Sequence, residues 1–136
     1  MATQTSAPAE ASNAYRTLGL YVRQFTVAVD ALVTAGTDTL EMLPILAGET
    51  VMDVVVIPFS DMDSGSALRF DVGDSDDADQ YLTAIDPGAG TGVAFRATVG
   101  QGTHYAADNK LVLSAQTPAT GAQAGTVTVI MYLQAD

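Results

Sequence analysis

The densest group of chemically competent side chains is a run of aspartates in the middle of the chain. Carboxylate oxygens are the ligands that Ca²⁺ prefers in proteins. Counted from Asp74, however, Ala78 stands at the fifth position and Asp79 at the sixth, where an EF-hand loop needs glycine. We therefore expect a solvated turn and assign no metal, cofactor or catalytic residue. The carboxylates that would serve if a metal did bind are Asp71, Asp74, Asp76, Asp77 and Asp79.

The remaining constellations offer little support for catalysis. His104 is the only histidine and lies in a loop-like stretch over residues 100–109. Serines and carboxylates are plentiful enough for a Ser-His-Asp arrangement or a carboxylate pair, but no Gly-x-Ser-x-Gly elbow is present. The glycine-rich segment 88–92 lacks the Lys-Ser/Thr of a phosphate-binding loop, and Asp61–Gly65 has the composition of a simple turn. We expect a protein that is not an enzyme.

Charge excludes a further set of functions. The chain has sixteen acidic and five basic residues, giving a net charge of −11. Binding to DNA, RNA or anionic lipid requires clustered basic side chains, so neither nucleic acid nor membrane is an expected partner. The cations would anchor carboxylates of a protein partner or pair with acids of this chain, and they are Arg16, Arg23, Arg69, Arg96 and Lys110.

Length and composition indicate one packed domain. The 136 residues are 48% hydrophobic and only 15% charged. The chain therefore has enough apolar residues to form a hydrophobic core, and much of its surface is uncharged. Such a surface suits contact with other protein chains. The absence of cysteine excludes disulfides and thiolate metal sites, and no apolar run is long enough to span a membrane.

Alternation of apolar and polar residues predicts strands. Period-two patterns are typical of half-buried strands, and short runs of this kind are separated here by Gly, Asp and Pro. Val51–Ile57 is apolar on both faces except at Asp53, which indicates a central strand. The other predicted strands are Ser66–Val72, Val93–Val99, Leu111–Ala115 and Thr126–Leu133.

In two further segments the sequence pattern is compatible with a helix. Leu18–Val33 fits either a strand or an amphipathic helix, and its β-branched residues favour the strand. After the acidic turn, Ala78–Ile85 predicts one short helix, capped by Ser75 or Asp76 and ended by Asp86-Pro87-Gly88.

These elements define the expected architecture. We expect a mainly β protein, with a β-sandwich or jelly-roll-like domain over residues 15–136 that carries one short helix. The small, polar, Pro-containing residues 1–14 predict an extended N-terminal arm.

Four segments that together span most of residues 35–134 form a recognisable series: Leu46–Val51 leading into Met52–Ile57, Leu68–Asp74, Asp76–Leu82 and Gly125–Val129. In this series the middle of the chain resembles capsid decoration, or cement, proteins of tailed bacteriophages. It implies an oligomeric, non-catalytic module that clamps adjacent subunits of a phage shell.

We therefore expect a virion structural protein on the outer surface of a capsid, made in the host cytoplasm. Its expected partners are the major capsid protein and its own copies, as a homodimer or homotrimer, with no small-molecule substrate. The alternative is a carbohydrate- or host-surface-binding β-sandwich of a phage tail or fibre. One version of that alternative depends on calcium bound by the acidic loop.

Overall fold

The computed structural model describes residues 20–28, 39–59, 65, 67–87, 94–118, 120 and 125–135. The predicted N-terminal arm, the glycine-rich segment 88–92, most of the turn 61–65 and both ends of the segment 18–33 lie outside the described residues. Within the described part, no helix has the length and hydropathy that crossing a bilayer requires.

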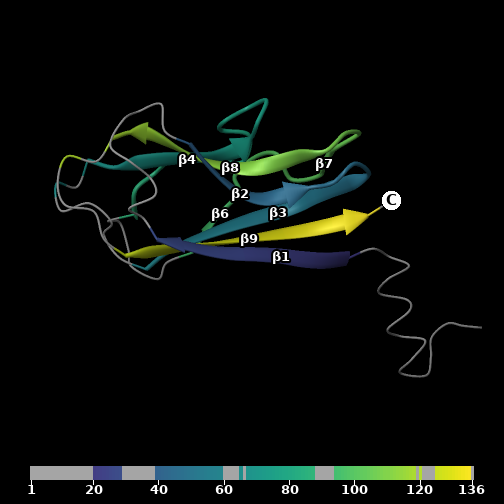
Figure 1. The fold of residues 1–136 in the computed structure, drawn as a ribbon, viewed down its shortest axis with the longest axis horizontal. Helices are drawn as coiled ribbons and strands as arrows, with labels where there is room; N and C mark the ends of the chain where they lie inside the picture. Colours follow the sequence, from purple (N-terminus) through teal and green to yellow (C-terminus); the bar gives the residue numbers. More distant parts are fainter. Residues whose placement is uncertain are drawn as a thin grey trace, which may run out of the picture.

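The described residues form two antiparallel sheets packed as a sandwich, which confirms the predicted mainly β class. The first, here called the β1 sheet, has the strand order β1-β9-β3-β6, with β7 also paired to β3. Its strands are β1 (Leu20–Ala28), β9 (Thr126–Ala135), β3 (Glu49–Pro58), β6 (Phe95–Arg96) and β7 (Thr103–His104). Figure 1 shows β1, β9 and β3 as long strands running side by side.

The second sheet, here called the β2 sheet, has the order β2-β8-β4-β5. Its strands are β2 (Thr39–Ile45), β8 (Asn109–Thr117), β4 (Arg69–Asp74) and β5 (Leu82–Ile85). In Figure 1, β8 and β4 lie across the molecule from β1 and β9, and the core fills the space between the two layers.

The core follows the alternation that the sequence predicts. On β9, the inward residues Val127, Val129, Met131 and Leu133 are all buried. The predicted central strand is confirmed as β3, which lies between β9 on one side and β6 and β7 on the other. Strands β1, β4 and β8 also form where the sequence predicts strands.

The predicted short helix over Ala78–Ile85 is wrong. Residues 75–80 form turns, and Leu82–Ile85 is strand β5, which pairs with β4 through Val72 opposite Leu82 and Phe70 opposite Ile85. The pairing buries Leu82 and Ile85 against the core while the two residues between them face outward. A helix this short has little stability of its own, so pairing with the sheet decides the conformation.

Two further differences concern strand length and number. In the described part of the predicted strand Val93–Val99, residues 94–99, only the two residues of β6 are paired as a strand, and the chain turns after Ala97. Strand β2 has no sequence prediction, because Pro44 and a bulge between Glu41 and Leu43 interrupt its period-two pattern.

Candidate functional site

The aspartate run forms a structural turn at the end of β4. The side chain of Asp74 is buried, and its Oδ1 accepts hydrogen bonds from the backbone N–H groups of Asp76, at 2.9 Å, and Asp77, at 2.8 Å. Asp71 accepts one from the backbone N–H of Ala84, at 2.8 Å. These two carboxylates therefore hold backbone rather than face a ligand.

The outer aspartates of the turn also have partners in the chain. Asp76 accepts a hydrogen bond from the Asn109 side chain, and Asp79 accepts one from Thr83. The exposed Asp77 has a raised pKa because its side chain shares a hydrogen bond with Asp79. In the part of the chain that the structure describes, no three His, Cys, Asp or Glu side chains converge as a metal site.

A chain of buried hydroxyl groups continues inward from Asp74. The Tyr105 hydroxyl donates to Asp74 Oδ2 at 2.5 Å and lies 2.7 Å from the Tyr81 hydroxyl. Burial raises the pKa of Tyr105, and its hydrogen bonds with Asp74 and Tyr81 raise that pKa further. Burial also raises the pKa of Tyr81. Both phenols therefore stay neutral at ordinary pH and act as structural links between the turn and the core.

His104 lies on β7, where its backbone pairs with Thr50 of β3, and it is exposed. The sequence analysis weighed this residue as the base of a hydrolase. Its position on a two-residue strand at the surface adds no geometric support to that interpretation.

The four basic residues within the described ranges all form ion pairs with acids of the same chain. Three of these ion pairs lie toward the surface: Arg96 with Asp53 at 2.5 Å, Arg69 with Asp86 at 3.3 Å and Lys110 with Glu41 at 2.6 Å. The fourth ion pair joins the partly buried Arg23 to the buried Glu49 at 2.6 Å. Of the two roles that the sequence leaves open for these cations, the structure shows pairing within the chain.

The Arg23–Glu49 pair joins three strands. Arg23 of β1 donates to both carboxylate oxygens of Glu49, at 2.6 and 2.7 Å, and to the Pro44 carbonyl of β2 at 3.1 Å. The Tyr21 hydroxyl and the backbone N–H of Leu46 also donate to Glu49, whose side chain is only 4% exposed. Burial alone raises the pKa of Glu49, but these donors outweigh it and hold the pKa below its ordinary value.

This buried pair has no counterpart among the residues that the sequence pattern singles out. Arg23 and Glu49 are 26 residues apart, and no spacing rule connects them. The signal that was present is a charged residue opening an apolar strand, since Glu49 directly precedes Thr50 and Val51 on β3.

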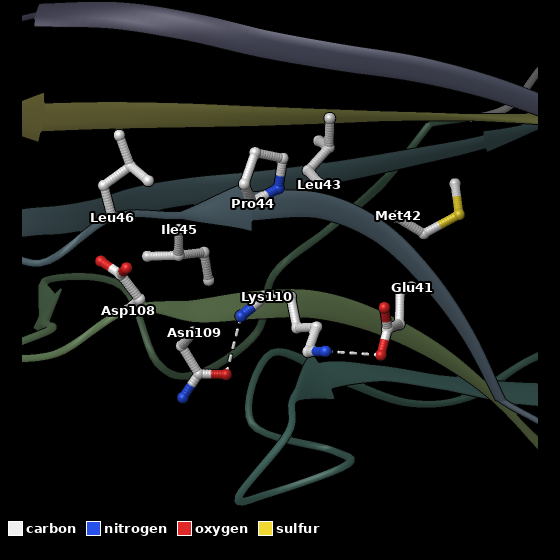
Figure 2. A pocket seen from close by; sticks show the side chains of 9 residues that line it. All are labelled: Glu41, Met42, Leu43, Pro44, Ile45, Leu46, Asp108, Asn109 and Lys110. Carbon is white, nitrogen blue, oxygen red and sulfur yellow. Dashed lines mark hydrogen bonds and ion pairs between the residues drawn. The ribbon is translucent and has the colours of Figure 1, made fainter.

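An open depression of about 430 Å³ lies along β2 and the start of β8. Figure 2 shows Glu41 and Lys110 pointing toward one another, and their ion pair lies at one end of the depression. At the other end, Asp108 accepts a hydrogen bond from the Ala47 backbone N–H at 2.9 Å. The charged groups lining the depression thus contact each other or backbone, and its open shape suits protein contact better than capture of a small substrate.

The outer face of the β1 sheet exposes several large apolar side chains among polar ones. Val22 of β1 stands opposite Tyr132 of β9, and the two side chains are 50% and 40% exposed. Leu20 on the same face is 46% exposed, and Thr26 and Thr128 share a hydrogen bond of 2.7 Å. These apolar side chains contrast with the net charge of −11, and they make this face a candidate for contact with another protein.

Chains in solved structures of phage capsids share the fold of this protein. The two-sheet sandwich is shared, over 84–86% of this chain, with chains in three structures of phage capsids. No family model matches the sequence, and no curated protein matches it either.

The particular structures are these. A chain of the cyanophage Pam1 capsid asymmetric unit is 24% identical, with a TM-score of 0.72, and the match covers 86% of this chain and 85% of that chain. A chain of the capsid of Ralstonia phage GP4 is 20% identical, with a TM-score of 0.64 and coverage of 86% and 84%. A chain of the acid-stable capsid of Helicobacter pylori bacteriophage KHP30 is 13% identical, with a TM-score of 0.60 and coverage of 84% and 86%. At these identities the likeness is one of fold.

Proposed function

We propose that this chain is a structural protein of a phage capsid, which binds the outer surface of the shell and stabilises it as a decoration protein. The observation that carries the proposal is the shared fold with chains of three capsid structures, over most of the length of both partners in each comparison. The proposed role is non-enzymatic, with the major capsid protein and other copies of this chain as partners.

The reciprocal coverage supports a small separate subunit. Because each match covers about the same share of both chains, the matched capsid chains are close to this chain in length. The sandwich therefore corresponds to most of each matched capsid chain. A small chain of this kind suits the role of a protein added to an assembled shell.

The described surface supports binding to the shell through burial of apolar side chains rather than through ion pairs. The outer face of the β1 sheet exposes the apolar side chains of Leu20, Val22 and Tyr132, while the basic residues that the structure describes are engaged by acids of the same chain. Burial of apolar surface stabilises a complex by roughly 25 cal/mol per Å² before the costs of association. We propose that this face meets the shell.

The arm over residues 1–14 is proposed as a tether that lies in a groove of a neighbouring subunit. Its small and polar composition gives it little reason to join the core of its own sandwich. Linking a weak arm contact to a weak face contact raises the overall affinity without new chemistry.

The alternative of a calcium-dependent, carbohydrate-binding module gains no such support. Asp71 and Asp74 are engaged by backbone N–H groups of their own loop. We therefore carry forward the capsid role alone.

Sedimentation of the purified chain with phage shells that lack it tests the proposal. We expect the full chain to move with the shells through a sucrose gradient, and Val22→Glu on the outer face to weaken that binding. Gln116→Glu on β8, also exposed, is the matched control and should bind like the unmodified chain. Failure of the full chain to bind any assembled shell would contradict the capsid role.

Deletion of residues 1–13 tests the arm separately. The expected result is reduced shell binding with an unchanged melting temperature, because the first strand that the structure describes begins at Leu20, well after the deleted residues. Undiminished binding by the shortened chain would remove the arm from the mechanism and leave the face contact in place.

A further inference from the structure

Strand β1 adds no fully buried side chain to the core of the sandwich. Its nine residues are exposed or half-buried, and none belongs to the group of buried core residues. Tyr21 and Val27 pack against that group while staying partly in solvent. Each of the other described strands longer than two residues contributes at least two buried apolar side chains. The core is therefore filled by the other strands.

The backbone of β1 is paired along one side alone. Its ladder with β9 runs from Leu20 opposite Gln134 to Ala28 opposite Thr126, and no other described strand pairs with it. Strand β9, in contrast, is paired on both sides, with β1 and with β3. Separation of β1 therefore breaks one ladder and leaves the pairing of β9 with β3 in place.

Beyond this ladder, the side chains of β1 are held mainly at the buried carboxylate of Glu49. Arg23 donates to both of its oxygens, at 2.6 and 2.7 Å, and the Tyr21 hydroxyl donates to one of them. We call these hydrogen bonds of Arg23 and Tyr21 the Glu49 clasp. A further contact, between the hydroxyl groups of Thr26 and Thr128, is exposed to solvent and contributes less.

The groups that β1 would leave behind keep partners of their own. The backbone N–H of Leu46, which is not on β1, donates to Glu49 at 2.6 Å. Arg23 gives up Glu49 and the Pro44 carbonyl, but its side chain is already 22% exposed and becomes solvated. A segment that loses few buried contacts opens at a lower free energy than the whole domain unfolds.

We propose that β1 is a detachable strand, which opens and closes as a unit on a sandwich that stays folded, and that the Glu49 clasp holds it closed. The open state exposes the edge of β9 and the side of the core that Tyr21 and Val27 partly cover. The inference rests on β1 and its contacts and stands whether or not the chain binds a capsid.

Native-state hydrogen exchange in low urea tests the opening on the unmodified chain. The amides of β1 that bond to β9 should have opening constants at least about 100-fold larger than those of β8, with a weaker dependence on urea, because less surface is exposed. The N–H groups of β9 point alternately to its two sides. Those toward β1 should exchange with β1, and those toward β3 with the core. Equal opening constants and urea slopes in β1 and β8 would overturn the proposal.

Trypsin provides a second measurement, because β1 and β8 each contain a single cleavage site. Arg23 lies on β1 and Lys110 on β8. Cleavage requires the strand to leave its sheet, so it reports the population of the open form. We expect cleavage after Arg23 well before cleavage after Lys110, with a resistant fragment that begins at Gln24. Cleavage at the same rate at both sites would contradict separate opening.

Two Glu→Gln substitutions test the clasp. Glu49→Gln weakens the partner of Arg23 and should raise the opening constant of β1 at least about 30-fold. Glu41→Gln is the matched control, because it breaks the exposed pair with Lys110 and leaves the clasp intact. The opening constant of β1 should not change in that control. Equal effects of the two substitutions on β1 would overturn the role of the clasp.

Ile85→Val on β5 provides the converse test, since Ile85 is buried in the core at 4% exposure. Loss of one buried methylene should raise the opening constants of β8 amides by about 3–10-fold. Those of β1 should stay unchanged, because its opening leaves Ile85 in place. An equal rise in β1 and β8 would show that β1 opens only when the whole domain unfolds. All of these measurements use the isolated chain and are therefore distinct from failure to bind shells.

Discussion

At the scale of single residues, Glu49 links β1, β2 and β3 through one buried carboxylate. Glu49→Gln removes the charge that Arg23 faces and leaves a partly buried guanidinium with a weaker partner. Breaking a buried pair is more costly than breaking an exposed one, and because Arg23 keeps 22% of its side chain in solvent we expect a loss of about 2–3 kcal/mol. Urea unfolding measures it.

The control for that change is Glu41→Gln, which breaks the exposed ion pair with Lys110. Both of these side chains are largely in water, at 45% exposure for Lys110 and 65% for Glu41. We expect a change of less than about 0.5 kcal/mol. Equal losses for the two variants would contradict the assignment of Glu49 as a structural centre.

The same carboxylate predicts the acid dependence of stability. The pKa of Glu49 is lower in the folded chain than its ordinary value of 4.5, so the folded state favours the ionised form. Its stabilisation is complete above pH 4.5 and is lost as pH falls through the lowered pKa. Melting temperatures measured across this range should fall less steeply for Glu49→Gln than for the unmodified chain.

Gly73 and Gly102 provide a matched pair of backbone tests. A Cβ at Gly73 would lie 2.0 Å from the Asp77 carbonyl oxygen, so the turn over β4 would have to move. At Gly102, where φ is 86°, a Cβ meets nothing within 4 Å. We expect Gly73→Ala to cost at least about 3 kcal/mol and Gly102→Ala about 1 kcal/mol. A tolerated Gly73→Ala, measured by thermal unfolding, would contradict the packing of this turn.

At the scale of elements, Tyr105 fastens the aspartate turn to the core. Tyr105→Phe removes its hydrogen bonds with Asp74 and Tyr81 and leaves a buried carboxylate oxygen short of a donor. We expect a loss of about 2–3 kcal/mol, against about 1 kcal/mol for Tyr81→Phe, which leaves the Asp74 contact intact. Urea unfolding of both variants checks the order, and a larger effect at Tyr81 would reverse the assignment.

The same scale shows what the sequence could and could not predict. Strands β3, β4, β8 and β9 follow from alternation or an apolar run, because burial of one or both faces imposes that pattern directly. Strand β5 was predicted as a helix, because its four residues take their conformation from pairing with β4. Strand β2 was missed, because its proline and bulge break the period of two.

The candidate site was less predictable than the fold. The aspartate turn was visible as a cluster, but the position of Asp74 in the core depends on Tyr105, 31 residues away. The Arg23–Glu49 pair likewise depends on how β1 and β3 lie relative to each other. Contacts of this range are set by sheet order, which residue spacing does not encode.

At the scale of the whole molecule, the fold is expected to be independent of calcium. Because backbone N–H groups and the Tyr105 hydroxyl already occupy the Asp74 carboxylate, calcium would have to compete with the contacts that hold the turn. We expect millimolar Ca²⁺ or EDTA to shift the melting temperature by less than about 1 °C. A rise with calcium that EDTA reverses would return the acidic loop to consideration as a ligand site.

The central claim is that the sandwich is an added subunit on the outside of a phage shell. The most direct measurement is a pair of cryo-electron microscopy reconstructions of the capsid, assembled with and without this chain. We expect the same shell in both, with extra density on the outer surface into which the β1 and β2 sheets fit. Identical reconstructions, or a shell that the chain itself encloses, would contradict it.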